Sequence, residues 1–385
     1  MKAPSSVILK IASRCNLKCD YCYMFEHADK TYLHKPPIMK EKVFFATIDE
    51  LVQSALKYDW KELKLLFHGG EPLLAGKKYF SEVLDYAKEK LIFLEKLSFS
   101  LQTNGVLIDP EWIELFLKYN IHFGISLDGP AKTNDRHRLD HKKRSTYEAT
   151  VQGIKLAQAA CMKDGLRFGS LLAVIDPKSS GREVFEHFVD ELDVYWMDFL
   201  LPDSNYEDFG DYHQLPPLSY AKFLQEVFDA WWERDDPRIH VRILENIVDM
   251  LIGGKSGMDA LGCGISHVLV VETDGSMEPL DVLKIVENSY TRQNMYIGKN
   301  SLEEFFSSPL LKSLYTEVEN LPRACRDCRY LHSCHGGYLP HRYSKTNGFQ
   351  NPSFYCHELK VIIEYIWQRI SETLTVQKST TMELL

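Results

Sequence analysis

The sequence predicts an α/β fold built on a parallel sheet, with a smaller cysteine-containing domain after it. Six short apolar runs alternate with helical patterns up to about residue 233. Three cysteines stand directly after the first run, and four more stand near the carboxyl end of the chain. Strands that alternate with helices pair in parallel, because each helix returns the chain to the end of the sheet where the previous strand began.

The six apolar runs are the expected strands of the first domain, and they cover residues 7–12, 63–68, 97–103, 122–127, 167–174 and 195–201. Between them, residues such as Phe44, Ile48, Leu51 and Ala55 recur at helical spacing. A helix over residues 219–233 closes this domain, and the Asp-Asp-Pro step that follows marks a boundary. The first domain is therefore expected to span residues 1–234.

The second domain is expected to span residues 235–374 and to combine helices with one β-hairpin. A helix is expected over residues 244–252, and the last helix over residues 359–374. Between them, two β-like runs flank Asp274 and Gly275, and an Asp-Gly pair in that setting is typical of a hairpin turn. Residues 375–385 are polar and are expected to form a C-terminal tail.

Composition excludes several classes of function. The 385-residue chain has a net charge of −9 and no basic block, so no nucleic-acid partner is expected. Its apolar runs are too short to cross a bilayer and its amino terminus lacks a signal-peptide pattern, so we expect a cytoplasmic protein without a membrane partner. Nine cysteines in a reducing compartment indicate metal ligands rather than disulfides.

The first cysteine group has the spacing C-x3-C-x2-C and consists of Cys15, Cys19 and Cys22. Three thiolates on one short loop can hold three irons of a cubane iron–sulfur cluster, which leaves the fourth iron open to a small molecule. A structural zinc loop is the alternative. Zinc sites usually pair a C-x2-C step with a second Cys or His pair, and none follows nearby.

This loop, with Tyr21 before its last cysteine and Gly69-Gly70-Glu71-Pro72 downstream, resembles the radical S-adenosylmethionine (SAM) enzymes. The resemblance implies an open, partial (β/α)6 barrel and a 4Fe-4S cluster that binds SAM and cleaves it to a 5′-deoxyadenosyl radical. In such barrels the loops at the carboxyl ends of the strands build the active site. The cysteine loop, the glycine pair and Ser126 all follow predicted strands.

The same resemblance assigns the SAM contacts to Tyr21, Gly70, Glu71, Ser126, Arg138 and Leu201. Gly70 and Glu71 would contact the methionyl amino group, and Ser126 the ribose. Arg138 would contact the carboxylate, although it could equally be a surface residue of the charged run 135–144. Leu201 would contact the adenine, or it could be an ordinary core leucine.

The second cysteine group has the spacing C-x2-C-x5-C-x21-C and consists of Cys325, Cys328, Cys334 and Cys356. Four thiolates complete a cubane without an open iron, and a four-cysteine zinc site is the alternative. The spacing resembles the SPASM extension of radical SAM peptide-modifying enzymes, which implies an auxiliary 4Fe-4S cluster. Many SPASM proteins carry a second auxiliary cluster, but Cys263 alone remains of those ligands here, so we expect a single auxiliary cluster.

The expected reaction also rests on resemblance. Asp281 aligns with an aspartate that sulfatase-maturating enzymes use as a base, although it could be an acidic residue that closes the hairpin. The stretches 272–281, 334–343 and 347–356 resemble maturases that form three-residue cyclophanes. They imply that a β-hydrogen is removed from a ribosomally synthesised precursor peptide, that an aromatic-to-Cβ cross-link forms, and that a flavodoxin- or ferredoxin-type protein donates electrons.

Other reactions stay open from the sequence. Formylglycine generation in sulfatases, thioether formation and epimerisation are the alternatives within the peptide-modifying enzymes. A non-catalytic iron–sulfur scaffold is a different class, and the intact Gly-Gly-Glu-Pro step and Ser126 argue against it.

Overall fold

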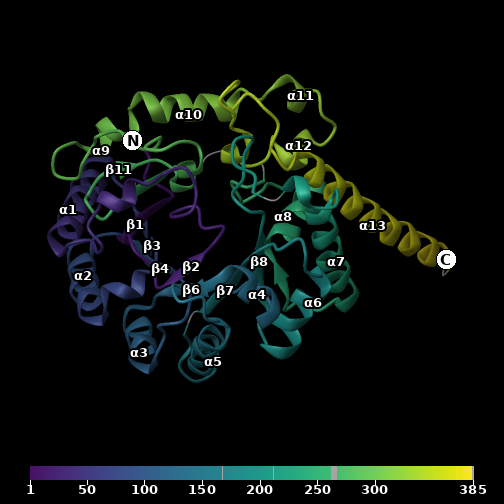
Figure 1. Cartoon of the computed structure of the whole chain (residues 1–385), viewed down its shortest axis with the longest axis horizontal. Coiled ribbons are helices and arrows are strands. Elements are labelled where there is room, and N and C mark those ends of the chain that lie inside the picture. Colours follow the sequence, from purple (N-terminus) through teal and green to yellow (C-terminus); the bar gives the residue numbers. More distant parts are fainter. Residues whose placement is uncertain (167, 211, 262–266, 384–385) are drawn as a thin grey trace. The chain divides into compact units, whose positions relative to one another are not determined.

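The computed structural model describes residues 1–166, 168–210, 212–261 and 267–383, with side chains as far as residue 373 (Figure 1). Contacts divide the chain into two compact units: residues 1–173 with 265–316, and residues 174–264 with 317–385. The expected domains 1–234 and 235–374 are a different division of the chain, and they stay a prediction.

In the first unit the strands lie in the order β11-β10-β1-β3-β4-β5-β7. All neighbours in this series pair in parallel except β10 with β11. The strands are β1 (Ser6–Ala12), β3 (Glu62–Gly69), β4 (Lys96–Thr103), β5 (His122–Ser126), β7 (Phe168–Val174), β10 (Val268–Val271) and β11 (Met277–Glu278). The parallel sheet and its strands confirm the predicted α/β class.

Helices of the first unit follow one another along the outer side of these strands (Figure 1). The apolar face predicted for the first helix is buried in the structure. The helices are α1 (Glu41–Tyr58), α2 (Lys77–Lys90), α3 (Pro110–Tyr119), α4 (Ala131–His137), α5 (Tyr147–Asp164), α9 (Leu302–Phe306) and α10 (Pro309–Glu319). Short 3-10 turns are η1 (Thr31–His34), η2 (Pro72–Ala75) and η5 (Asp281–Ile285).

The predicted hairpin is present, and it belongs to the sheet of the first unit. Strand β10 pairs in parallel with β1, with Val7 opposite Leu269. All four residues of β10 are buried, because the strand lies between β1 and β11 and has no exposed edge. This pairing brings the segment after the hairpin, which begins with Asp281, to the sheet near β1.

The second unit is mainly helical around two short strands. Its strands are β8 (Trp196–Leu200) and β9 (His240–Val241), which pair in parallel. Its helices are α6 (Gly181–Glu186), the π-helical turn η3 (His187–Glu191), α7 (Ser219–Arg234), α8 (Arg242–Leu251), α11 (Arg323–Arg326), α12 (Leu331–Cys334) and α13 (Cys356–Glu383), with 3-10 turns η4 (Tyr212–Gln214) and η6 (Leu339–Arg342). Helix α13 packs against α7 and α8.

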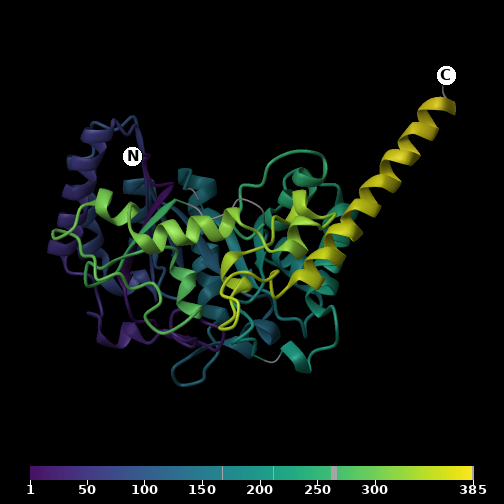
Figure 2. The ribbon, with the colours of Figure 1, turned by 90° about the horizontal axis from the view of Figure 1, so that it is seen from above.

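The last helix is longer than predicted. It continues through most of the expected tail 375–385 as far as Glu383, and Figure 2 shows its last turns extending beyond α7 and α8. The helix thus ends later than residue 374, and the expected division into a domain that ends there and a tail over residues 375–385 stays a prediction.

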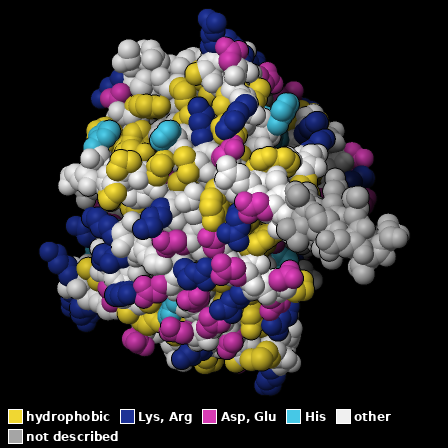
Figure 3. Space-filling view, turned by 90° about the vertical axis from the view of Figure 1, so that its right-hand side faces the viewer, with side chains coloured by type: hydrophobic (Ala, Val, Ile, Leu, Met, Phe, Trp, Pro, Cys, Tyr) yellow, Lys and Arg dark blue, Asp and Glu magenta, His cyan; other side chains and the backbone are white. Residues whose placement is uncertain are grey.

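None of the helices in the described part of the chain has the length and apolar character needed to cross a lipid bilayer. On the face shown in Figure 3, basic and acidic side chains are interspersed.

Candidate functional site

The three-cysteine loop lies in the first unit, directly after β1. A short strand within it, β2 (Leu17–Cys19), pairs antiparallel with β6 (Arg138–Asp140), which places Cys19 opposite Arg138. Burial raises the pKa of Cys15 to about 12 and that of Cys22 to about 11, and the thiolates raise each other's pKa further. The three thiols therefore need a cationic group among them before they can ionise together.

Gly70 lets the turn after β3 approach this loop. The Gly70 amide donates to the Ala12 carbonyl at 2.7 Å, and the Glu71 amide donates to the Arg14 carbonyl at 3.0 Å. A Cβ atom on Gly70 would lie 2.2 Å from the Arg14 carbonyl oxygen. Only glycine fits this contact, so the turn is built to hold the cysteine loop closely.

Glu71 is completely buried, and its side chain joins its own turn to the end of β4. Its Oε1 accepts hydrogen bonds from the Leu73 amide at 3.0 Å and the Thr103 hydroxyl at 2.8 Å, and its Oε2 accepts from the Asn104 amide at 2.8 Å. Burial raises the pKa of Glu71 to about 7, although these hydrogen bonds oppose the rise. A cationic group of a ligand would favour the ionised form.

Asn104 extends this connection to the cysteine loop, because its Nδ2 donates to Asn16 Oδ1 at 2.7 Å. Sequence reasoning did not assign Thr103, Asn104 or Asn16 to the site. The available signal was the Gln-Thr-Asn-Gly turn, which follows a predicted strand at the same edge of the sheet as the glycine pair.

Tyr21, Asp128 and Arg138 form a second connection to the loop. The Tyr21 hydroxyl donates to Asp128 Oδ2 at 2.6 Å, and Arg138 NH1 donates to the Tyr21 hydroxyl at 2.9 Å. Arg138 is buried, so the alternative of a surface residue was wrong. Ser126 is half-buried at the end of β5 and accepts from Gln102 Nε2 at 2.9 Å.

Asp128 is a residue of this site that the sequence did not predict. It lies two residues after Ser126, directly after the predicted strand 122–127. Leu201 follows β8 in the second unit and is half-buried. Its contact with adenine stays a prediction, as do the SAM contacts of the other five residues.

A buried ionic group surrounds Asp281. Lys10, in the middle of β1, pairs with Asp281 Oδ2, and the Tyr23 hydroxyl donates to the same oxygen at 2.5 Å. The Lys10 Nζ also donates to the Tyr23 hydroxyl at 2.8 Å. It lies 3.0 Å from His68 Nδ1, because the pairing of β1 with β3 places Lys10 opposite His68. Asp281 is thus not a surface residue that closes the hairpin, because it is only 5% exposed.

These contacts keep Asp281 ionised. Burial alone would raise the pKa of Asp281, but the Lys10 charge and the hydrogen bonds from Lys10 and Tyr23 outweigh it and hold that pKa well below its usual range. Burial and the Lys10 charge lower the pKa of His68 to about 3, so this imidazole is neutral. Lys10 had a sequence signal that was overlooked: it is the one charged residue in the apolar run 7–12.

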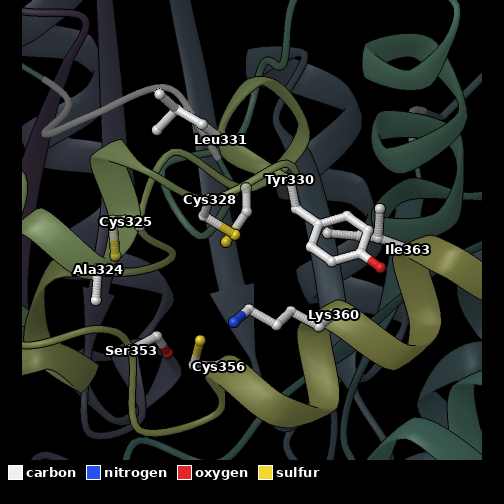
Figure 4. A pocket seen from close by; sticks show the side chains of 11 residues that line it. Ala324, Cys325, Cys328, Tyr330, Leu331, Ser353, Cys356, Lys360 and Ile363 are labelled. Atoms are coloured by element: carbon white, nitrogen blue, oxygen red, sulfur yellow. The ribbon is translucent and has the colours of Figure 1, made fainter.

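The four later cysteines lie together in the second unit. They line one cavity, and Figure 4 shows the sulfurs of Cys325, Cys328 and Cys356 directed into it. Ala324, Leu331 and Ile363 make much of the remaining lining apolar. Cys263, the remaining thiol of the expected second set, lies outside the described residues.

The chemistry of both cysteine groups fits iron–sulfur clusters. The three thiols of the first loop can ligate three irons of a cubane, and the four later thiols, which line one cavity, can ligate all four. A four-cysteine zinc site is the alternative at the second group.

Comparison with known proteins agrees with this geometry. Residues 9–187 match the radical SAM superfamily. The cysteine-type anaerobic sulfatase-maturating enzyme of Clostridium perfringens (strain 13) is 27% identical over 95% of this chain and 97% of its own length. The serine-type enzyme of Bacteroides thetaiotaomicron is 25% identical over 89% of this chain and 84% of its own length.

Among solved structures, anSMEcpe with bound AdoMet and the Cp18Cys peptide has a TM-score of 0.82 and 26% identity, and the match covers 96% of this chain and 98% of that one. The fold is therefore a radical SAM fold, with parallel strands in an open barrel, as predicted. The relatives named here are sulfatase-maturating enzymes, and they give no support to the cyclophane-forming subgroup.

Proposed function

We propose that this chain, whose residues 9–187 form a radical SAM domain, is an enzyme that oxidises a side chain of a peptide or protein substrate. The observation that carries the proposal is the nearly full-length similarity to a structure that holds both AdoMet and a peptide. The close approach of Gly70 to the cysteine loop supports it, because this is the geometry that the SAM site requires.

The cofactors follow from the two cysteine groups. Cys15, Cys19 and Cys22 would hold the 4Fe-4S cluster that binds SAM, and the four later cysteines an auxiliary 4Fe-4S cluster. When bound, these groups supply one-electron chemistry: reductive cleavage of SAM at the first and electron uptake at the second. A flavodoxin- or ferredoxin-type protein would donate the electron that starts the reaction.

Residues of the first unit would orient SAM. Gly70 and Glu71 would contact its amino group, where the Glu71 carboxylate would accept hydrogen bonds, and Ser126 would contact the ribose. Arg138 would contact the carboxylate of SAM, and the hydrogen bond from Arg138 to Tyr21 fixes the position of that guanidinium. A contact of Leu201 with the adenine stays a prediction from the sequence.

Asp281 takes the proton that the substrate loses. The side chain of the substrate loses first a hydrogen atom and then one proton and one electron, so it loses two hydrogens in total. Asp281 is a carboxylate at neutral pH and can accept that proton, and Lys10 and Tyr23 hold it in place. The Lys10 charge makes the proton transfer less favourable than it would be to an unpaired carboxylate, so Lys10 sets the basicity of Asp281.

Oxidation of a cysteine or serine to formylglycine, as in sulfatase maturation, is the reaction that the comparisons support best. An aromatic-to-Cβ cross-link in a ribosomally synthesised peptide is a second candidate. One observation favours it: Pro279-Leu280-Asp281 and Gly336-Gly337-Tyr338 stand where a second auxiliary cluster would have cysteines.

Mass spectrometry separates the two reactions. The reconstituted, reduced protein would be incubated with SAM and either a cysteine-containing sulfatase peptide or a precursor peptide encoded beside its gene. Sulfatase-type activity would oxidise the cysteine side chain to a thioaldehyde by loss of two hydrogens. Water then hydrolyses the thioaldehyde to an aldehyde with release of hydrogen sulfide, and a hydrazide reagent traps the aldehyde. A cross-link removes two hydrogens and leaves nothing to trap. No change in either peptide, together with no 5′-deoxyadenosine, would contradict the proposed function.

A further inference from the structure

We propose that Lys360 raises the reduction potential of the auxiliary cluster and so favours electron uptake there. The inference rests on the proposed function in one respect, namely that the four later cysteines hold an iron–sulfur cluster. Lys360 lines the cavity of the four later cysteines, and it would act on the cluster through its positive charge.

Lys360 is placed to act on this cluster. It stands four residues after Cys356 near the start of α13, so one helical turn brings the two side chains to the same face. Lys360 lines the same cavity as the four cysteines. Figure 4 shows its amine directed into the cavity, on the side where the sulfurs of Cys328 and Cys356 lie.

The charge of Lys360 is not neutralised by a carboxylate. Helical spacing offers Glu364 as the natural partner. However, Glu364 Oε2 accepts hydrogen bonds from Arg329 at 2.8 Å and from the Tyr330 hydroxyl at 2.6 Å. Within the described ranges of the chain, no carboxylate forms an ion pair with Lys360. The positive charge of Lys360 therefore acts mainly on the iron–sulfur cluster that would fill the cavity.

The sign of the effect follows from charge. A cubane with four thiolate ligands is negatively charged and gains a further negative charge on reduction, so a nearby cation stabilises the reduced form more than the oxidised form. The apolar side chains of Ala324, Leu331 and Ile363 exclude water from part of the cavity, which weakens screening. Lys360 thus shifts the potential upward.

Arg342 is another cation near these cysteines, and it has a different role. It is almost completely buried, and its guanidinium donates to the carbonyl oxygens of Phe349 at 3.0 Å and Glu317 at 3.1 Å. Its replacement would leave those carbonyls unpaired and disturb the fold. Among the residues that the structure describes, no backbone carbonyl accepts a hydrogen bond from the Lys360 side chain, so its charge can be removed with the fold intact.

The test measures the reduction potential of the auxiliary cluster alone. The background is the full chain in which Cys15, Cys19 and Cys22 are all replaced by Ala, so that only the auxiliary cluster gives an EPR signal. In a redox titration of the reconstituted protein, Lys360→Met is expected to shift the midpoint potential to a more negative value. Lys360→Arg keeps the charge and should leave the potential near that of the background.

Lys222→Met is the matched control, because Lys222 is an exposed lysine of α7 in the same unit, 3.9 Å from Glu226, and does not line the cavity. Its potential should not change. An unchanged potential in Lys360→Met with full iron content would overturn the inference. Loss of the cluster from both Lys360→Met and Lys360→Gln would also overturn it, since Lys360 would then be needed for assembly. A background protein that holds zinc or no iron would instead contradict the proposed function.

Discussion

The ammonium of Lys10 lies against a carboxylate oxygen of Asp281, although 271 residues separate the two along the chain. The side chain of Lys10 is completely buried and that of Asp281 is 7% exposed. Strand β10 makes this contact possible, because it pairs with β1 and delivers the following segment to the sheet. The ion pair places the proposed base in the same compact unit as the three-cysteine loop.

Asp281→Asn is expected to separate SAM cleavage from product formation. The amide cannot take up a proton, so modified peptide should fall by about 10²-fold or more, while 5′-deoxyadenosine is still produced. Mass spectrometry of the peptide and chromatography of the nucleoside, from one reaction mixture, measure both.

The matched control is Asp164→Asn, which removes an exposed carboxylate at the end of α5 in the same unit. It should leave both products at wild-type amounts. Asp281 would not be the base if Asp281→Asn formed modified peptide at the wild-type rate. Iron content and the circular dichroism spectrum show whether the variant is folded.

Gly70→Ala is expected to remove the first cluster and spare the second. The added Cβ would overlap the Arg14 carbonyl, so the cysteine loop must shift, at a cost of about 1–3 kcal/mol. Iron analysis after anaerobic reconstitution should give about half of the wild-type iron per chain, because the auxiliary cysteines lie in the other unit.

Gly257→Ala serves as the control for this glycine, since only one atom lies within 4.0 Å of the Cβ it would add. It should bind iron as the wild type does. Full iron content in Gly70→Ala would show that the close approach of the two loops is not needed for the first cluster.

The secondary structure of the first unit could be predicted well because its signals are local. Buried parallel strands are continuous apolar runs, and the predicted run 63–68 became β3 with one more residue at each end. The β10–β1 pairing could not be predicted, because nothing local specifies which strand a hairpin joins. For the same reason the sequence predicted a role for Asp281 but not for its neighbours Lys10, Tyr23 and His68. These lie in β1, in the cysteine loop and in β3.

The SAM affinity of the wild type is expected to depend on pH through Glu71. Burial raises the pKa of Glu71 to about 7, and the amino group of SAM is best bound by the ionised carboxylate. As the pH falls below about 7, Glu71 becomes protonated and the affinity should fall by up to about tenfold per pH unit.

Isothermal titration with SAM between about pH 6 and about pH 8 measures this dependence. Glu71→Gln should bind SAM more weakly than the wild type. Its SAM affinity should no longer show the pH dependence that arises from protonation of Glu71. Parallel pH profiles for the wild type and Glu71→Gln would mean that Glu71 does not titrate in this range or does not contact SAM.

Acid is expected to destabilise the fold through Glu278. This buried carboxylate accepts from Lys35 and from Lys284, each at 2.6 Å, and from the Thr291 hydroxyl at 2.7 Å. Burial alone would raise the pKa of Glu278, but the charges of Lys284 and Lys35 lower it to about 2 from an ordinary 4.5. The folded-state pKa is thus depressed, so its stabilisation is present above about pH 4.5 and is lost as the pH falls toward about 2.

Urea unfolding at neutral and acidic pH measures this loss. Glu278→Gln should lower the free energy of unfolding by about 1–3 kcal/mol at neutral pH, because Lys35 and Lys284 each lose their nearest carboxylate and keep Glu272 at 3.2 Å. It should also flatten the acid dependence. Glu303→Gln removes a 57% exposed partner of Lys57 and should cost less than about 1 kcal/mol. Equal effects of the two substitutions would contradict this account of the buried group.

The cysteines and the Gly-Gly-Glu-Pro turn could be identified from sequence because their spacing is itself the signal. Residues that orient them could not, because Asn104 and Asp128 act through hydrogen bonds between segments that only the fold brings together. The type of reaction was harder to predict from the sequence than the residues of the site. The absence of cysteines at the positions of a second auxiliary set pointed away from sulfatase maturation, whereas similarity along nearly the whole chain points toward it.

If this chain removes a hydrogen atom from a peptide side chain by means of SAM, that atom enters 5′-deoxyadenosine, and deuterium makes the transfer visible. The reconstituted, reduced protein would be given SAM and a substrate peptide deuterated at the Cβ of the target residue. We expect 5′-deoxyadenosine that carries one deuterium in amounts that match the modified peptide. Unlabelled 5′-deoxyadenosine beside a modified peptide, or none at all from a protein with full iron content, would contradict hydrogen removal by means of SAM.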